Sequence, residues 1–225
     1  MNRFFGNFVI IGLVFVLCGY ALKVYLNNKY LSKSSTINTV QQVADNEPFQ
    51  EGDIIFQTSL SEQSKAIQLA TKSPYSHCGI LFKEDNELYV FEAIQRVQKT
   101  PLKKWIERGK ERHYVVKRLK NAKELITEAS LIKMKEISGK FEGKRYDLTF
   151  EWTDDKIYCS ELIWKIYKQA LGIEIGKLEK LKTFDLTNNV VKYKMQERYG
   201  GNIPKEEIMI SPQAIFESEL LESIH

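Results

Sequence analysis

The sequence predicts an α+β fold, in which helices pack against an antiparallel sheet. Two observations predict it: short β-type runs bounded by turn residues, and separate segments in which apolar residues recur at helical spacing. A third is the composition, because 43% of the 225 residues are hydrophobic and 12% are aromatic, as in ordinary folded proteins. Such a chain can bury the core of one packed domain, and its bulk is not intrinsically disordered.

Three β-type runs build the predicted sheet. They are residues 52–57 ("GDIIFQ"), residues 77–94, which turn at "KEDNE" to form an antiparallel hairpin, and residues 113–119 ("HYVVKRL"). Within the hairpin, strand alternation places His77 on one face and Cys78 on the opposite, apolar face.

Four helices are predicted to pack on this sheet, because capping residues precede apolar residues at helical spacing. The third has the clearest apolar stripe; it begins at Cys159 and stops at Gly172. The lysine-rich region 173–204 is weakly periodic, and we expect it to cover one edge of the sheet or the cleft. The four helices are residues 59–70 with a Ser59–Glu62 capping box, residues 121–139 with Asn121 and Glu124 as caps, Gly139 as the end and Leu125, Ala129 and Ile132 as the apolar face, residues 159–171 with Cys159, Leu162, Ile163, Ile166, Tyr167 and Ala170 as the stripe, and a terminal helix that starts at Ser211 and Pro212 and carries Ile215 and Leu220.

Residues 1–26 predict an export signal or a membrane anchor. Within them, a basic start precedes an apolar run at 4–22, which is close to the roughly 17–25 residues that a membrane-spanning helix needs. Gly19 and Ala21 are small residues of the kind that a signal peptidase reads, so cleavage and retention both stay open, as does lipidation of Cys18. We therefore expect an exported or membrane-associated protein of the periplasm or cell envelope.

Residues 27–48 are polar and predict a tether between this segment and a folded domain at residues 49–225. The net charge of +4 comes from 33 basic and 29 acidic residues that are interspersed, so no nucleic-acid-binding surface is expected. The three cysteines and three histidines make no disulfide framework and no repeated metal-ligand spacing. We expect neither a metal nor a cofactor.

Three residues predict a thiol-dependent site, each with a plainer alternative. Cys159 opens a helix, where unpaired N–H groups and the dipole lower a thiol pKa, but it also lies in phase with the apolar stripe and fits the core equally well. His77 faces away from the apolar side of its strand, which suits a base in a groove and also an ordinary surface histidine. Glu92 can orient the imidazole only if it lies on the same face of the hairpin as His77. This holds if the residue numbers of two directly paired positions in the hairpin add up to an odd number.

A resemblance to the circularly permuted papain-like amidase family, relatives of NlpC-type cell-wall hydrolases and of lecithin retinol acyltransferase, is carried by six segments: "GDIIFQ", "YSHCGILF", "YVFEAI", "KRYDLTF", "YCSELIWKIY" and "ISPQAIFES". They occur in order between residues 49 and 218. The resemblance implies a permuted papain-like fold in which the strand residue His77 precedes the nucleophile Cys159 and Glu92 is the third polar residue. It also implies that Tyr146 lines the cleft, where it binds substrate or helps the oxyanion.

The function that the resemblance implies is that of a cysteine peptidase or amidase, a thiol hydrolase that cleaves an amide or ester bond in a cell-wall peptide, an isopeptide or a lipid-linked substrate. The alternative is a membrane-tethered protein of the same fold that binds a lipid or peptide without turnover. The expected partners are that small substrate and the membrane. Cys78 stands where the family usually has an aliphatic residue; strand alternation points it away from His77 and argues against a disulfide with Cys159.

Overall fold

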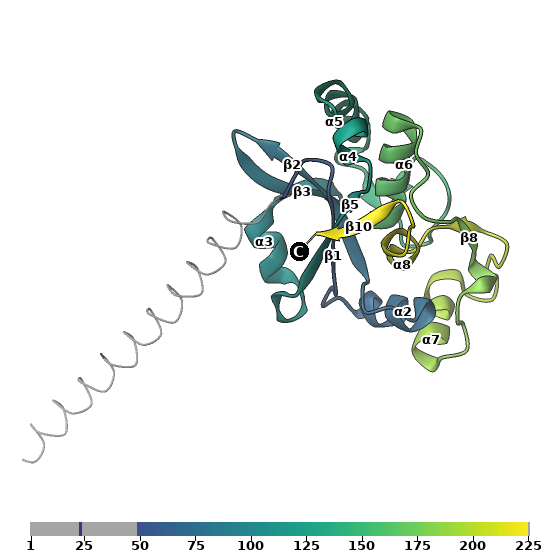
Figure 1. Ribbon diagram of the computed structural model, residues 1–225. Helices are drawn as coiled ribbons and strands as arrows, with labels where there is room; N and C mark the ends of the chain where they lie inside the picture. The colour runs from purple at the N-terminus through teal and green to yellow at the C-terminus, as the bar shows by residue number, and fades with distance from the viewer. Residues whose placement is uncertain (1–22, 24–48, 225) are drawn as a thin grey trace, which may run out of the picture. The chain divides into compact units, whose positions relative to one another are not determined.

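A six-stranded antiparallel sheet forms the centre of the folded part in the computed structural model, which describes Lys23 and residues 49–224 (Figure 1). The strand order is β10-β5-β1-β2-β3-β4, so β1, the first of the described strands, lies inside the sheet and β10, the last of them, lies at its edge. With helices packed against it, this sheet confirms the predicted α+β class. The strands are β1 Ile54–Gln57, β2 His77–Glu84, β3 Glu87–Ala93, β4 Val97–Pro101, β5 Tyr114–Leu119 and β10 Leu221–Ile224.

The β2–β3 hairpin sets the register on which the candidate site depends. Both residues of its loop, 85–86, have positive φ (50° and 65°), which is the backbone conformation of a two-residue type I′ turn. Ile80 pairs with Phe91, so the paired positions sum to an odd number. Alternation then puts Glu92 on the same face as His77, and the condition stated for Glu92 is met.

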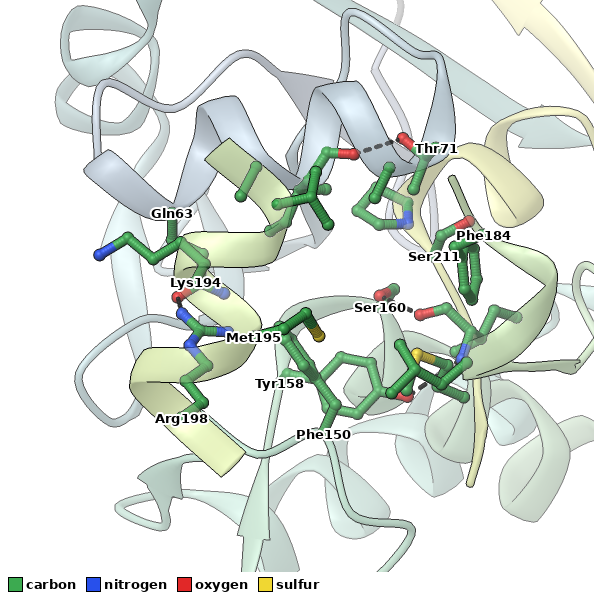
Figure 2. Close-up of a pocket in the computed structure, with 18 of the residues that line it drawn as sticks. Gln63, Thr71, Phe150, Tyr158, Ser160, Phe184, Lys194, Met195, Arg198 and Ser211 are labelled. Carbon is green, nitrogen blue, oxygen red and sulfur yellow. Dashed lines mark hydrogen bonds between the residues drawn. The ribbon is translucent and has the colours of Figure 1, made fainter. Parts of the chain in front are cut away.

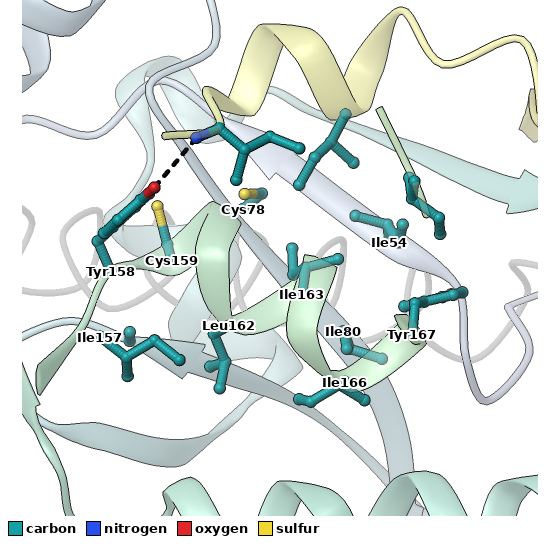
Figure 3. Close-up of a cluster of buried hydrophobic side chains, with 14 of the residues drawn as sticks. Ile54, Cys78, Ile80, Ile157, Tyr158, Cys159, Leu162, Ile163, Ile166 and Tyr167 are labelled. Atoms are coloured by element: carbon teal, nitrogen blue, oxygen red, sulfur yellow. Dashed lines mark hydrogen bonds between the residues drawn. The ribbon is translucent and has the colours of Figure 1, made fainter. Parts of the chain in front are cut away.

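Helices cover both faces of the sheet. On the face of Cys78, the main hydrophobic cluster lies between the sheet and α5 and α6; Figure 3 shows Leu162, Ile163 and Ile166 of α6 within this cluster. On the opposite face, α3 packs against β3 and β4, and its Trp105 is fully buried. The helices are α2 Glu62–Thr71, α3 Leu102–Arg108, α4 Ala122–Leu125, α5 Glu128–Phe141, α6 Cys159–Leu171, α7 Asn189–Tyr199 and α8 Pro212–Phe216, and the short elements are η1 Lys110–Arg112, η2 Leu181–Thr183, β6 Arg145–Tyr146, β7 Lys156–Ile157, β8 Glu179–Lys180 and β9 Ile208–Met209.

Two helix predictions are confirmed at their starting residues. α6 begins at Cys159 and ends before Gly172, whose φ of 74° suits glycine, and all the residues of its predicted stripe are buried. α8 begins with Pro212 behind the N-cap residue Ser211, whose Oγ accepts a backbone N–H at 3.0 Å. It is short, however, and ends at Phe216.

The capping box predicted for the first helix is wrong. α2 begins at Glu62 with Ser61 as the N-cap residue. The hydroxyl of Ser59 instead lies 3.2 Å from both the hydroxyl and the backbone nitrogen of Ser61, so it fixes the turn before the helix.

The single helix predicted for residues 121–139 is two helices, α4 and α5. Thr127 separates them: its hydroxyl accepts the N–H of Ser130 and opens α5 with a capping box of its own. α5 then continues through Gly139 to Phe141, because an interior glycine weakens a helix without ending it. The predicted apolar face was also wrong, since Leu125, Ala129 and Ile132 are exposed, and the buried residues of α5 are Met134, Ile137, Ser138 and Phe141.

Two parts of the fold were not predicted at all. β4 and α3 follow the hairpin directly, and β10 pairs antiparallel with β5. Leu220, expected on the terminal helix, lies between α8 and β10 and is exposed.

The predicted signal or anchor at residues 1–26 and the tether at 27–48 lie outside the described residues, apart from Lys23. Among the helices of the described part, none is long and apolar enough to span a bilayer.

Candidate active site

Cys159 is the first residue of α6, directly after the N-cap residue Tyr158. The first backbone bond of the helix runs from Leu162 N–H to the Tyr158 carbonyl at 3.0 Å, so the N–H groups before it carry the partial positive charge of a helix N-terminus. Ile210, from a later part of the chain, hydrogen-bonds to the residues on either side of Cys159. Its N–H donates to the Tyr158 hydroxyl at 3.0 Å, and its carbonyl oxygen accepts from Ser160 Oγ at 2.8 Å. These bonds fix the backbone around Cys159, whose side chain is buried, with the residue only 2% exposed.

His77, the first residue of β2, has its imidazole ring held from several sides. Its Nε2 lies 2.5 Å from Glu92 Oε2, and its side chain also hydrogen-bonds to Cys159. Because Glu92 occupies Nε2, Nδ1 is the nitrogen left for the sulfur. The indole of Trp105 stacks on the imidazole with ring centroids 6.0 Å apart and an interplanar angle of 28°. The structure thus brings Cys159, His77 and Glu92 together.

Glu92 is fully buried, and its carboxylate is surrounded by donors. Besides His77, Oε2 accepts Trp105 Nε1–H at 2.9 Å and Arg108 Nη2–H at 2.6 Å, while Oε1 accepts the Thr100 hydroxyl at 2.6 Å. A buried carboxylate needs such partners to stay ionised. Burial acts to raise the pKa of Glu92, but hydrogen bonds and charges from His77 and Arg108 lower it to about 2.

The Cys159–His77 pair is shifted toward its ionised form. Burial alone would lower the pKa of His77, but the hydrogen bond and charge of Cys159, followed by those of Glu92, raise it to about 9. A hydrogen bond from the Cys78 thiol, together with the hydrogen bond and charge of His77, holds the pKa of Cys159 well below its usual range, although burial opposes this. Both shifts favour a thiolate beside an imidazolium, and the two groups titrate together.

Cys78 is a second buried thiol, and it touches Cys159. Both cysteines of the described part are free thiols, and Figure 3 shows them in one hydrophobic cluster. Alternation does direct Cys78 away from His77, but the inference that this separates it from Cys159 is wrong, because α6 packs on the Cys78 face of the sheet. Burial, followed by the hydrogen bond and charge of Cys159, raises the pKa of Cys78 well above its usual range.

Tyr146, at the end of β6, is half-buried beside the site. Its hydroxyl oxygen accepts Gln63 Nε2–H at 3.2 Å. Burial, followed by the negative charge of Cys159, raises the pKa of Tyr146 well above its usual range, so the phenol keeps its proton. Because the oxygen accepts from Gln63, the O–H of Tyr146 is available to donate to a group near Cys159.

Two hollows meet at the Cys159–His77 pair. The first, the apolar pocket, comprises about 680 Å³ including its open mouth, and Cys159 lines it (Figure 2). The second, the open groove, comprises about 1160 Å³ including open solvent, and His77 lines it. The apolar pocket includes Ala66, Ala70, Leu181, Val191, Met195 and Met209, and the open groove is of mixed character, with Ser59, Ser61, Ser76, Gln95, Arg96 and Arg145 beside Ile67, Ala93, Ile94 and Leu148.

The walls of the apolar pocket come from distant parts of the sequence. Figure 2 shows α2 and α7 on adjoining sides of it. Because α7 belongs to the lysine-rich region 173–204, this region covers the cleft, which was one of the two positions expected for it.

Several residues that complete the site were not predicted. Trp105 and Arg108 approach Glu92 from α3, and Thr100 does so from β4. The sequence did contain a pattern from which Trp105 and Arg108 could have been predicted. They are three positions apart, so they lie on one face of a helix, and a buried carboxylate requires hydrogen-bond donors of their kind. Gln63 carried no comparable signal, since only the packed position of α2 brings it to Tyr146.

A solved relative has the same fold. The chain is 48% identical to the protein in a structure described as "Crystal structure of metalloprotein yiiX from Escherichia coli O157:H7", with a TM-score of 0.75, over 78% of this chain and 96% of that one. Within residues 49–224, no three His, Cys, Asp or Glu side chains are grouped to hold a metal ion. His77 instead hydrogen-bonds to both Glu92 and Cys159.

Sequence comparison agrees with the fold. The chain is 47% identical over 175 residues to the "Uncharacterized protein YiiX" of Escherichia coli strain K12, covering 78% of this chain and 85% of that protein. A family model described as "Permuted papain-like amidase enzyme, YaeF/YiiX, C92 family" matches residues 48–225. It spans the sheet, α6 and the whole of the site. The chain therefore belongs to the permuted papain-like amidase family.

Proposed function

We propose that this protein is a cysteine hydrolase that cleaves an amide or ester bond, with Cys159 as nucleophile, His77 as acid and base, and Glu92 as the group that orients His77. Membership of a papain-like amidase family supports the reaction class. We also propose that it works at the cell envelope, to which the apolar segment at residues 4–22 directs or attaches it.

The observation that carries the proposal is the way the imidazole of His77 is held between two partners. Glu92 binds Nε2 at 2.5 Å, which leaves Nδ1 for the Cys159 sulfur. A cysteine protease needs a thiolate, a base in hydrogen-bond reach and a third group that fixes the ring. The lowered pKa of Cys159 and the raised pKa of His77 supply the ionised pair that this chemistry starts from.

In the first half of the reaction, the Cys159 thiolate attacks the substrate carbonyl and forms a tetrahedral intermediate. The donors that we assign to the negative oxygen are the N–H groups at the start of α6 and the O–H of Tyr146. The intermediate then collapses: the bond to the leaving nitrogen or oxygen breaks, and His77 Nδ1 gives that atom its proton. The acyl group remains on sulfur as a thioester.

In the second half, water attacks the thioester while His77, now neutral, accepts a proton from the water. The carbon–sulfur bond breaks, the carboxylic acid leaves, and Cys159 returns as the thiolate beside protonated His77. The ion pair with Arg108 keeps Glu92 charged throughout, so Glu92 stabilises the imidazolium without taking its proton.

Trapping the acyl-enzyme tests this proposal. The full chain, purified in mild detergent, is mixed with p-nitrophenyl acetate, quenched in acid and mapped by peptide mass spectrometry. We expect a burst of nitrophenol and an acetyl group on Cys159, and neither in Cys159→Ala. Cys18→Ala is the matched control, since it removes a thiol from the N-terminal segment and should keep the burst. Acetyl on another residue, or undiminished turnover in Cys159→Ala, would reject the proposal; tight ligand binding without turnover would favour the alternative of a tethered binding protein.

A further inference from the structure

Cys78 and Cys159 are two thiols in contact that come from different layers of the fold. Cys78 is the second residue of β2 and Cys159 is the first residue of α6, and both are free and buried. Their side chains hydrogen-bond to one another and lie in the cluster between the sheet and the helix (Figure 3). Two thiols in this arrangement can be joined by a disulfide if their sulfur atoms move together by about 1–2 Å.

The hydrogen bond alone does not require a cysteine at position 78. A hydroxyl is a stronger donor than a thiol and would hold the Cys159 thiolate at least as well. Packing does not require a cysteine either, because Cys78 is 0% exposed in the hydrophobic cluster and an aliphatic side chain would pack there. A thiol differs from both alternatives in that it can bond covalently to the sulfur of Cys159.

The two thiols differ in access and in ionisation. Cys159 lines the apolar pocket, which opens to solvent, whereas Cys78 lines neither of the two hollows and is fully buried. The hydrogen bond from Cys78, together with the hydrogen bond and charge of His77, holds the pKa of Cys159 well below its usual range. The thiolate is the form of cysteine that peroxides oxidise. A small oxidant therefore reaches Cys159 and reacts there first.

Oxidation of Cys159 would remove part of what keeps Cys78 unreactive. Burial, followed by the hydrogen bond and charge of Cys159, holds the pKa of Cys78 well above its usual range. A sulfenic acid is neutral, so the negative charge of Cys159 is lost when its sulfur is oxidised. Cys78 is then a thiol in contact with an electrophilic sulfur, which is the arrangement of a sensor cysteine and its resolving cysteine.

We propose that Cys159 and Cys78 are a peroxide-modified thiol pair, in which hydrogen peroxide oxidises Cys159 and Cys78 then closes a reversible disulfide with it. The disulfide inactivates the enzyme and protects Cys159 from irreversible oxidation to a sulfinic acid. The loss of activity rests on the proposed function, because it takes Cys159 as the nucleophile, whereas formation of the disulfide does not depend on it. Disulfides persist in the oxidising compartments outside the cytoplasm, where we place the protein.

The modification has two steps. In the first, the Cys159 thiolate attacks one oxygen of hydrogen peroxide, the oxygen–oxygen bond breaks, and the departing hydroxide takes the proton of His77 and leaves as water. Cys159 is now a sulfenic acid, oxidised by two electrons. In the second, the Cys78 sulfur attacks the Cys159 sulfur, the sulfur–oxygen bond breaks, and the leaving hydroxide takes the thiol proton of Cys78. A dithiol reverses the modification by exchange and is itself oxidised to a disulfide.

Peptide mapping of the full-length protein in mild detergent detects the disulfide. The reduced protein is treated with a small excess of hydrogen peroxide, its remaining thiols are alkylated in denaturant, and the digest is analysed by mass spectrometry without reductant. We expect a linked pair of peptides that contain Cys78 and Cys159, and the loss of this link on treatment with dithiothreitol. Cys18→Ala is the matched control and should give the same linked pair.

Activity is followed by the nitrophenol burst from p-nitrophenyl acetate, with each protein compared with its own reduced form. Peroxide should abolish the wild-type burst, and dithiothreitol should restore most of it. In Cys78→Ser no disulfide can protect Cys159, so the fraction of the burst that dithiothreitol restores should be at least about fivefold smaller. In Cys159→Ala, Cys78 should remain a free thiol after peroxide treatment, because no sulfenic acid forms beside it.

The inference is overturned if Cys159 is not oxidised, if it becomes a sulfinic acid while Cys78 stays free, or if its disulfide is with Cys18 or with a second chain. Equal recovery of the wild type and Cys78→Ser would overturn it as well. The mapping uses the wild-type chain and stays decisive if Cys78→Ser does not fold. If the disulfide forms but reduced Cys159 is never acetylated, the hydrolase fails and the thiol pair is retained. If Cys159 is acetylated but no disulfide forms, the thiol pair is overturned while the hydrolase stands.

Discussion

Glu92 Oε2 lies 2.5 Å from His77 Nε2, although the two residues are on different strands and are not a directly opposed pair. The contact runs diagonally across the hairpin, over the position of Gly79. At Gly79 a side chain is excluded, since a Cβ there would come within 2.3 Å of Val90 Cγ1 and 3.0 Å of the Phe91 carbonyl oxygen. The missing side chain leaves the space through which Glu92 reaches the imidazole.

Gly79→Ala should destabilise the protein by about 1–3 kcal/mol, because the backbone and a buried valine cannot both move away from the new methyl group. Gly139→Ala makes the same chemical change on α5, where a Cβ would meet nothing within 4 Å, and should stabilise by about 0.5–1 kcal/mol. Urea unfolding at neutral pH measures both. Equal stability of the two variants would show that Gly79 does not fill a packed position.

Glu92→Gln should reduce kcat/KM for p-nitrophenyl acetate by roughly 10²–10⁴-fold, because the amide cannot stabilise the imidazolium of His77 as the carboxylate does. Cys159→Ala should lose more, since it removes the nucleophile itself. A wild-type rate in Glu92→Gln would remove Glu92 from the site and leave Cys159 and His77 in place.

The same carboxylate should make the fold sensitive to acid. The pKa of Glu92 is about 2 in the folded protein against an ordinary 4.5, so its contribution to stability is complete above about pH 4.5 and is lost as the pH falls toward 2. Between pH 6 and pH 3 the wild type should therefore lose about 2 kcal/mol more unfolding free energy than Glu92→Gln. Urea titrations of both proteins at the two pH values measure these losses of unfolding free energy. The contributions of the other carboxylates are the same in both proteins and cancel in the difference. Equal losses would contradict the low pKa.

Cys78 should influence the reactivity of its neighbour. Its thiol donates a hydrogen bond that helps hold the pKa of Cys159 below the usual range. Cys78→Ala should therefore raise that pKa and slow the alkylation of Cys159 at about pH 6 by roughly 10–100-fold, as expected for the loss of one hydrogen bond to a charged group. Cys78→Ser keeps a donor and should retain most of the rate. If both variants label like the wild type, the contact between the thiols has no effect on the thiolate.

The sequence was most informative where apolar residues recurred at a helical period over several turns and a glycine marked the end of the helix. The stripe of α6 has an unambiguous helical period and a glycine at its end, so the position of Cys159 at the start of a helix could be predicted. The register of the hairpin stayed open, and the choice of Cys159, His77 and Glu92 as a site came from the resemblance to permuted papain-like amidases. The apolar stripe of α5 was misjudged for two reasons. Its apolar residues are compatible with two alternative faces, and the helix begins after its N-cap residue Thr127 and not at residue 121.

Contacts between distant segments could not be predicted in this way. Trp105 and Arg108 reach Glu92 only because α3 folds back across β3 and β4. Cys78 was misjudged for a related reason: alternation gives the face of a residue, but the position of α6 above that face decides its neighbours. The apolar pocket likewise exists only because α7 packs beside α2.

The measurement that tests the Cys159–His77 pair most directly is the rate of iodoacetamide labelling of Cys159 and Cys78 against pH, read by mass spectrometry in the wild type and in His77→Ala. A thiol with an ordinary pKa near 8.5 is almost wholly protonated at about pH 6, whereas Cys159 should label briskly there and before Cys78, whose pKa is raised. The rate should change again as His77 loses its proton near its pKa of about 9. His77→Ala should slow labelling of Cys159 at pH 6 by at least about tenfold. Labelling of Cys159 no faster than a free peptide thiol, or unaltered by His77→Ala, would contradict the pairing and with it the proposed hydrolase.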